Sequence, residues 1–303
     1  MAKLTWQAYW KPKGPRQKTA AAIALILALF QVYTALFGAF DALIQRAAHL
    51  GLGLVLLFLL YPGWGKRSGK ASPSAWGLAG LSALVCGYLL FNYDWIMDER
   101  FSLITELHWY EWALGIAAIL LVMEATRRLF STPLLIVVTV FVLYPFAGPY
   151  LGGPFHTSPI TINDMVDFNF LTLGGIFGIP LGVSATEIAL FVIFGAILLH
   201  SGGALLFSNL ATALTGNVVG GPAKVAVVAS SLMGTITGSG AANVATTGVA
   251  TIPMMKRAGY RPEFAGAVEA VASTGGQLMP PVMGAAAFVM SAFSGIPYHT
   301  IIY

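Results

Sequence analysis

The sequence predicts an all-α protein that crosses a membrane several times. Hydrophobic residues occupy 57% of its 303 positions and charged residues only 9%. The mean hydropathy of +0.78 lies far above that of soluble globular chains. The apolar residues also form runs of the length that a spanning helix needs, about 20 residues. We therefore expect about six full spans, together with a re-entrant helical hairpin and a broken transmembrane helix.

The six predicted spans are separated by charged connections that alternate in sign. The spans cover residues 19–40, 47–63, 74–96, 112–130, 132–149 and 183–200. Basic clusters mark the inner side; they are Lys3, Lys11, Lys13, Arg16 and Lys18, then Lys66, Arg67 and Lys70, then Arg127 and Arg128. The connections at residues 41–46 and 94–111 are mainly acidic. This pattern places the N-terminus inside, and the pI near 9.2 reflects topology rather than a nucleic-acid partner.

Three other parts of the sequence have predictions of their own. The first span follows a basic leader, as in a signal peptide, but it has no small-residue cleavage site, so we expect an uncleaved anchor. Residues 150–180 suit an outer connection with a short interfacial helix at 162–171. Residues 203–217 are mildly amphipathic and favour a helix along the inner surface; a short ordinary loop is the alternative.

Residues 225–255 carry no charge and lie between Lys224 and Lys256. As one helix they would extend about 46 Å, too long for a single crossing of a core about 30 Å thick. Two full crossings would need about 40 residues. We therefore predict a re-entrant hairpin, with half helices at 225–236 and 241–255 and a turn at 237–240 that reaches the midplane.

The composition of the predicted turn agrees with this geometry. The stretch "TITGSGAANVATTG" (residues 235–248) contains small and polar residues in an apolar region. Irregular backbone at membrane depth must be buried in protein or line a cavity, and small residues such as Gly234 and Gly238 allow close helix packing. Packing alone is the alternative, but it does not explain the polar members of the stretch, which are Thr237, Ser239, Asn243, Thr246 and Thr247.

A second interruption lies in the next crossing, residues 264–294, which contains "STGGQLMPP". Pro280 and Pro281 cannot continue a helix but suit the first turn of a new one. Gly275 and Gly276 suit the end of the preceding half helix. We therefore predict a broken helix whose break lies at the depth of the hairpin turn.

Two interrupted helices at one depth offer a specific chemistry. Helix C-termini expose carbonyl oxygens and helix N-termini expose N–H groups. Carbonyls of the two interruptions, with nearby hydroxyls, could bind sodium, and the N-termini beyond Ser239 and Gln277 could face an anionic substrate. Discontinuous helices of this kind indicate a secondary-transporter site.

Residues 220–290 carry a family resemblance over some 70 contiguous positions, through "NVATTG", "GYRPEFAGAVEA" and "STGGQLMPPVMGAAAF". They resemble the large permease part of the tripartite ATP-independent periplasmic (TRAP) transporters, in particular the branch with a fused permease and a TAXI-type binding protein. Residues 174–198 also resemble that branch. By this resemblance residues 1–130 are the small-subunit-like domain and residues 131–303 the N-terminal part of the large permease.

The resemblance implies sodium-coupled uptake of an organic acid in the bacterial inner membrane by an elevator-like movement. A periplasmic TAXI-type binding protein would deliver the substrate, and sodium would be the coupling ion, with no other cofactor. The implied sodium-binding residues are Thr237, Gly238, Ser239, Gly240, Asn243, Ser273, Thr274, Gly275 and Gly276. The implied substrate-binding residues are Ser239, Asn243 and Gln277. The family contains two inverted repeats, each with a hairpin and a broken helix, whereas this sequence shows only the first. We therefore expect the chain to be truncated after the first repeat, at Tyr303, and not to transport by itself.

Two other function classes remain open from the residues alone. An ion channel can also use a re-entrant loop, although the chain shows neither a carboxylate ring nor a carbonyl filter motif. A membrane enzyme would need a nucleophile or an acid–base pair that the sequence does not display. Glu269, an ionisable residue in the broken helix, is a candidate for ion coupling; an ion pair with Lys256, Arg257 or Arg261 is the alternative.

Overall fold

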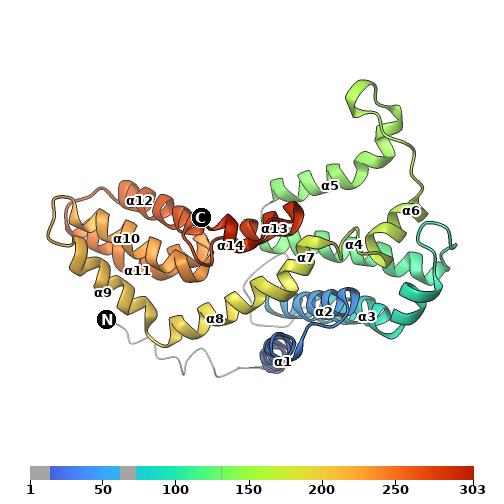
Figure 1. Ribbon diagram of the computed structural model, residues 1–303, viewed down its shortest axis with the longest axis horizontal. Helices are drawn as coiled ribbons and strands as arrows, with labels where there is room; N and C mark the ends of the chain where they lie inside the picture. The colour runs from blue at the N-terminus through green and yellow to red at the C-terminus, as the bar shows by residue number, and fades with distance from the viewer. Residues whose placement is uncertain (1–13, 62–72, 131) are drawn as a thin grey trace. The chain divides into compact units, whose positions relative to one another are not determined.

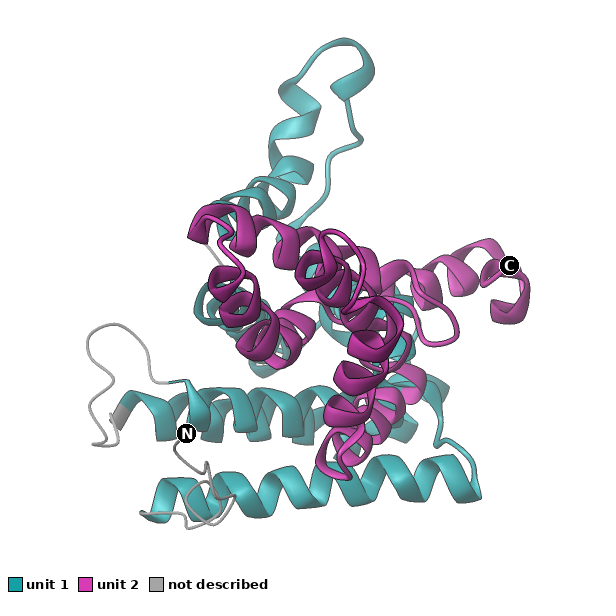
Figure 2. Ribbon diagram, turned by 90° about the vertical axis from the view of Figure 1, so that its left-hand side faces the viewer, with its two compact units in different colours: residues 1–185 teal, residues 186–303 magenta. Residues whose placement is uncertain are grey.

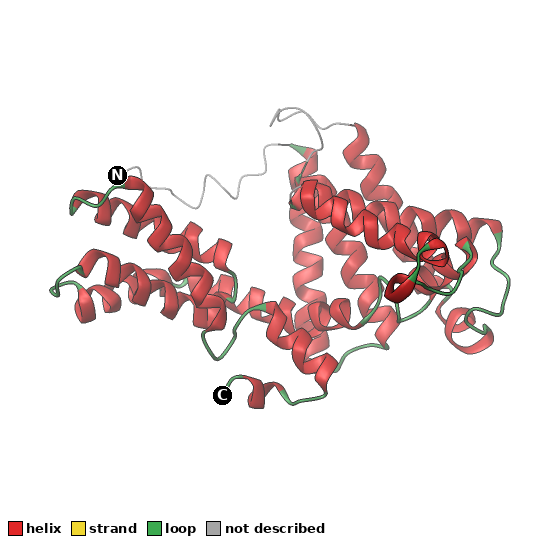
Figure 3. Ribbon diagram, turned by 90° about the horizontal axis from the view of Figure 1, so that it is seen from above, coloured by secondary structure: helices red, strands yellow, loops and turns green. Residues whose placement is uncertain are grey.

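A computed structural model describes residues 14–61, 73–130 and 132–303, and every regular element within these ranges is helical (Figures 1 and 3). The all-α prediction is therefore confirmed. Six of the predicted inner basic residues, Lys3, Lys11, Lys13, Lys66, Arg67 and Lys70, lie outside the described residues.

The chain forms two compact units, residues 1–185 and 186–303 (Figure 2). The boundary falls inside a helical run that extends from residue 179 to residue 200. This division follows packing within the chain. The domain boundary predicted at residue 130 concerns correspondence with separate subunits of relatives, and it stays a prediction.

Unit 1 contains the longer helices. These are α1 (Pro15–Phe37), α2 (Ala42–Leu60), α3 (Pro73–Phe91), α4 (Trp109–Leu129) and α5 (Thr132–Ala147). Shorter helical segments connect them: η2 (Trp95–Glu99), η3 (Gly148–Tyr150), η4 (Gly153–Phe155), α6 (Ile162–Val166), η5 (Asp167–Leu171) and α7 (Ile179–Val183). The segment η6 (Ser184–Ile188) crosses the boundary between the two units. The core of unit 1 packs large apolar side chains such as Phe58, Leu89 and Phe170, all 0% exposed.

Among the described residues, five helical segments are long and apolar enough to cross a membrane: residues 15–37, 42–60, 74–91, 132–150 and 179–200. They correspond to five of the six predicted spans. The remaining predicted span forms α4, which is 21 residues long but includes four charged residues, Glu111, Glu124, Arg127 and Arg128. Glu124 pairs with Arg127 and Arg128 at 2.7 Å. These charges make α4 less apolar than the other five helices.

The short helix predicted at 162–171 is present as α6 followed by η5; its position at the membrane interface stays a prediction. The Thr161 hydroxyl accepts a hydrogen bond from the Asp164 N–H at 3.1 Å, and the Asp164 carboxylate accepts one from the Thr161 N–H at 2.8 Å. This reciprocal cap satisfies two N–H groups that a helix start leaves unpaired.

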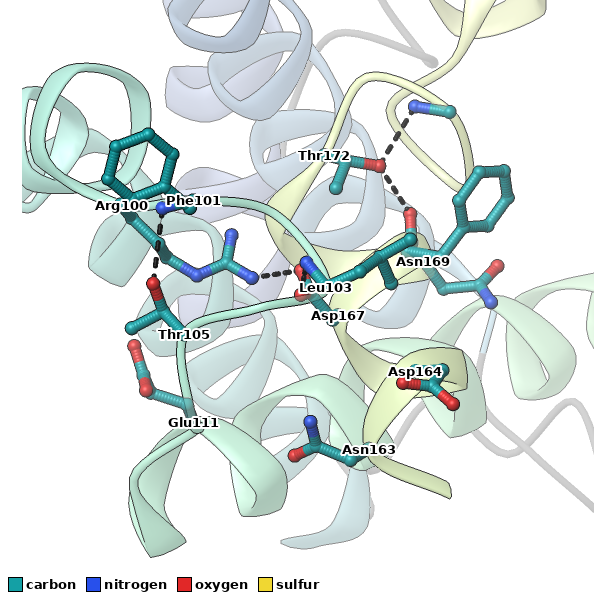
Figure 4. A network of polar contacts seen from close by, with 12 residues as sticks. Arg100, Phe101, Leu103, Thr105, Glu111, Asn163, Asp164, Asp167, Asn169 and Thr172 are labelled. Atoms are coloured by element: carbon teal, nitrogen blue, oxygen red, sulfur yellow. Dashed lines mark hydrogen bonds and ion pairs between the residues drawn. The ribbon is translucent and has the colours of Figure 1, made fainter. Parts of the chain in front are cut away.

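An ion pair joins the segment before α4 to η5. Arg100, which precedes α4, pairs with Asp167 of η5, and both side chains are 0% exposed (Figure 4). Asp167 also accepts a hydrogen bond from the Leu103 N–H at 2.6 Å. Arg100 belongs to the connection predicted to lie outside, which stays a prediction. The structure buries its charge against a carboxylate, as the cost of burying an unpaired ion requires.

Unit 2 contains α8 (Ala189–His200), α9 (Gly203–Thr215), α10 (Gly221–Thr237), α11 (Gly240–Arg257), α12 (Pro262–Gly275), η7 (Gly276–Leu278), α13 (Ala285–Ser294) and α14 (Tyr298–Ile301). Helices α10, α11 and α12 lie side by side (Figures 1 and 3). The alternative of an ordinary loop at 203–217 is wrong, because α9 is a helix. Its leucines 205, 206, 210 and 214 are exposed.

Candidate functional site

The predicted hairpin is present as α10 and α11, joined by a two-residue turn. Gly238 ends α10 with φ 57° and its N–H donates to the Gly234 carbonyl at 3.2 Å. This left-handed conformation suits glycine. Ser239 is extended, and its hydroxyl accepts from the Ala242 N–H at 3.4 Å, so it caps α11.

Both arms of the hairpin are longer than predicted. Helix α10 has 17 residues and α11 has 18, whereas the predicted halves started later and ended earlier. Gly220 in the left-handed region and Pro222 in the first turn start α10 before Lys224. At about 1.5 Å per residue the arms extend about 26 and 27 Å.

The predicted broken helix is also present, but its second half starts later than expected. Helix α12 ends at Gly275, η7 covers Gly276–Leu278, and α13 begins only at Ala285. The expectation that the prolines open the new helix is therefore wrong, and so is an N-terminus just beyond Gln277. The physical reason is that Met279 and Pro280 each precede a proline, which disfavours the helical region; Met279 is accordingly extended, with ψ 121°.

The hairpin turn contacts the segment that interrupts the broken helix. A side chain added at Gly238 would collide with the Met283 carbonyl, and one added at Gly240 would lie 2.9 Å from Nε2 of Gln277. Met283 itself has φ 57°, a conformation that costs a non-glycine residue about 1–2 kcal/mol. The two interruptions predicted to lie at the same depth are thus in direct contact.

Backbones also approach closely behind the turn. A side chain at Gly234 would collide with the backbone of Gly276, and one at Gly276 would lie 2.6 Å from Nδ2 of Asn243. The small residues of α10 therefore serve close packing against the break, as predicted for Gly234. The sequence predicts that Gly238 packs against a neighbouring helix together with Gly234. In the structure it ends α10 and forms the turn, which requires its left-handed φ.

Asn243 joins the two arms of the hairpin. Its Nδ2 donates to the Ser230 carbonyl at 2.7 Å, and the residue is 0% exposed. Its Oδ1 is buried without a hydrogen-bond partner among the described residues. A buried acceptor without a partner is unfavourable by about 1–3 kcal/mol, so this oxygen is available to a ligand.

The predicted site residues divide by exposure. Gly240, Asn243, Ser273 and Gly276 form a buried seam between α10, α11 and the break, and Thr237 and Gly238 are half-buried. Ser239, Thr274, Gly275 and Gln277 are exposed. The Thr237 and Thr274 hydroxyls donate to carbonyls of their own helices, Met233 at 3.2 Å and Ala270 at 2.8 Å. The structure therefore brings the buried members together and leaves the exposed ones at the edge.

A second polar cluster lies next to this seam, around Glu269 of α12. Its carboxylate is 0% exposed and accepts hydrogen bonds from four hydroxyls. These are Ser230 and Ser273, both at 3.1 Å, Thr251 at 2.5 Å, and Thr247. No ion pair found among the described residues includes Glu269. The alternative of pairing with Lys256, Arg257 or Arg261 is therefore wrong; Arg261 instead lies 3.6 Å from Glu263.

Sequence reasoning missed Ser230 and Thr251. Thr247 and Thr251 are spaced four residues apart on α11, so they share one face of that helix, and this spacing was a usable signal. Ser230 gave no signal, because a single serine in α10 becomes significant only once three helices have packed together.

The fold and the paired interruptions define a multi-span membrane protein built on discontinuous helices, the architecture of secondary transporters. Residues 117–303 match the family model of the tripartite ATP-independent periplasmic transporter, DctM component. The chain belongs to this family, whose members are transporter permease components and not enzymes.

Curated relatives match about a third of the chain. YgiK of Salmonella typhimurium is 34% identical over 100 residues, which are 33% of this chain and 23% of that protein. The C4-dicarboxylate TRAP transporter large permease proteins DctM of Rhodobacter capsulatus and Pseudomonas aeruginosa are 33% and 36% identical over 94 residues. These matches cover 31% of this chain and 21% and 22% of the respective relatives. No solved structure matches the chain.

Proposed function

We propose that this chain is part of the permease of a sodium-coupled secondary transporter that imports an organic acid. The observation that carries the proposal is the contact of the hairpin turn at Gly238 with the interrupting segment at Met283. In a membrane, such paired interruptions place helix ends where water is scarce, and their unpaired backbone groups then need ions or substrate as partners.

The coupling ion would bind at the buried seam. Sodium is a hard cation that takes oxygen ligands, and the seam offers the unpartnered Oδ1 of Asn243 and the Ser273 hydroxyl. Backbone carbonyls of residues 237–240 and 273–276 would complete the set of ligands. Gly238, Gly240 and Gly276 support this assignment because side chains there would fill the space between the segments.

The substrate would bind at the exposed edge of the same site. Ser239 begins α11 at this edge, and Gln277 belongs to the interruption. A helix N-terminus favours an anion by about 0.3–1 kcal/mol. Two relatives are named as C4-dicarboxylate permeases, which makes a carboxylate the substrate class that we propose. Asn243 would line both the sodium and the substrate positions.

The partner and the location follow from the family. We propose that a periplasmic solute-binding protein of the TAXI type delivers the substrate, because the sequence of residues 220–290 resembles permeases that work with such proteins. We further propose the bacterial inner membrane with the N-terminus inside, because Arg16 and Lys18 lie in the first turn of α1.

Uptake into proteoliposomes tests this function. A permease containing this chain, with its binding protein, should accumulate a labelled carboxylate only when sodium is present outside. Ser239→Ala and Asn243→Ala should reduce sodium-dependent uptake at least about tenfold, since each removes a proposed ligand of the substrate or of sodium. Ser294→Ala, whose hydroxyl bonds its own helix at 2.7 Å, is the matched control and should transport normally. Unchanged sodium coupling in both site variants would refute the assignment.

A further inference from the structure

We propose that Glu269 is the centre of a second monovalent-cation site, one that binds sodium deeper in α12 than the seam. The carboxylate lies six positions before Gly275, which corresponds to about 9 Å along the helix. It is 0% exposed, and its described neighbours supply hydroxyls but no cationic side chain.

A buried Glu269 carboxylate without a cationic side chain nearby favours the binding of a cation. Burying an ionised carboxylate costs several kcal/mol unless it is paired, and hydroxyl donors lower that cost without removing the net negative charge. One monovalent cation would make the cluster neutral, whereas a divalent ion would leave an excess positive charge in a dry interior. The charge balance therefore favours an ion such as sodium.

The hydroxyls around Glu269 can turn their oxygens toward a cation. The Thr247 hydroxyl lies 2.9 Å from the Asn243 carbonyl, and the Thr251 hydroxyl lies 3.0 Å from the Thr247 carbonyl. A hydroxyl has one proton and two lone pairs. Each threonine can therefore donate to its own helix instead of to Glu269 and leave lone pairs for an ion.

A second observation supports a ligand in this region. Asn243 donates to the carbonyl of Ser230, whose hydroxyl belongs to the cluster, and its buried Oδ1 has no partner among the described residues. The Glu269 cluster and the seam also share Ser273. The two proposed sites are therefore adjacent but distinct in charge, because only the deeper one contains a carboxylate.

Direct binding of radioactive sodium to the purified full chain tests the inference. Glu269→Gln should bind one sodium ion fewer per chain than the wild type. In choline it should unfold at the same temperature as the wild type or higher, because the unpaired charge is gone. Glu263→Gln is the matched control on the same helix: its side chain is 75% exposed, and it should bind sodium as the wild type does.

Thr251→Val keeps the shape of the side chain and removes one oxygen. It should raise the sodium concentration for half-saturation of one site about fivefold. A change of this size corresponds to the loss of one contact that is as strong as a typical hydrogen bond. This variant decides the question if Glu269→Gln does not fold.

Any one of four results would overturn the inference. The first is that Glu269→Gln binds as many sodium ions per chain as the wild type, or that Thr251→Val binds sodium with an unchanged concentration for half-saturation. The second is a loss of stability in Glu269→Gln that is equal in sodium and choline. The third is stabilisation by acid in place of sodium, which would assign the site to a proton. Loss of sodium by Asn243→Ala alone would support the seam and refute the Glu269 site, so the two proposals fail separately.

Discussion

Gly276 lies where three helical segments of unit 2 meet. A Cβ atom there would lie 2.6 Å from Nδ2 of Asn243 and 3.0 Å from the Ser230 carbonyl. Its φ of −58° is ordinary for any residue. Glycine is therefore needed at this position because a side chain would not fit, and not because of the backbone conformation.

Gly276→Ala should consequently destabilise unit 2 through overpacking, by about 1–3 kcal/mol, and lower the unfolding temperature. Gly275→Ala is the adjacent control: it has φ −59° and nothing within 4 Å of an added Cβ. It should be neutral or stabilising by about 0.4–1 kcal/mol. Thermal unfolding of both variants in detergent measures the difference, and equal effects would contradict the close approach.

Elements with strong local signals could be predicted from the sequence. Gly238 marks the end of α10 and Gly275 the end of α12, and the absence of charged residues from 225 to 255 indicates a hairpin. The start of α13 at Ala285 differs from the predicted start, because Pro280 and Pro281 disfavour the helical conformation at the residues before them. The Glu269 cluster could not be predicted in full, because its hydroxyls come from three helices that only packing brings together.

The short helix α6 depends on its cap. The Thr161 N–H donates to the Asp164 carboxylate at 2.8 Å, and this bond lowers the pKa of Asp164 below its ordinary value of 3.8. A lowered pKa in the folded state means that the charged form stabilises the helix start. The contribution is complete above the ordinary pKa and is lost as the pH falls through the lowered pKa.

Hydrogen exchange at the Thr161 amide should report this loss. At near-neutral pH the amide should be more protected in the wild type than in Asp164→Asn, since the neutral amide oxygen is a weaker acceptor than a carboxylate. Below the lowered pKa the two proteins should exchange alike. A difference that persists unchanged in acid would mean that the charge of Asp164 does not hold the cap.

At the scale of the whole chain, the two units have cores of different kinds. Unit 1 buries large side chains such as Phe58 and Phe170, whereas unit 2 buries small clusters such as Ala226, Met255 and Ala265. Close backbone approach at Gly234 and Gly276 replaces side-chain bulk in unit 2. Segments packed in this way leave polar groups such as Asn243 and Glu269 close to one another, which is why the candidate sites lie in unit 2.

The predicted topology can be tested by labelling single cysteines in cells. The chain has one cysteine, Cys86, which is buried and can be replaced by alanine to give a background without thiols. Ser102, Lys224 and Ala258 are exposed and suit substitution by cysteine.

An impermeant maleimide added outside should label Ser102→Cys, which lies in the acidic outer connection. It should label Lys224→Cys and Ala258→Cys only after the membrane is permeabilised, because both ends of the hairpin are expected inside. Labelling of Lys224→Cys and Ala258→Cys from opposite sides would mean that α10 and α11 cross the membrane once, and the re-entrant hairpin would then be wrong.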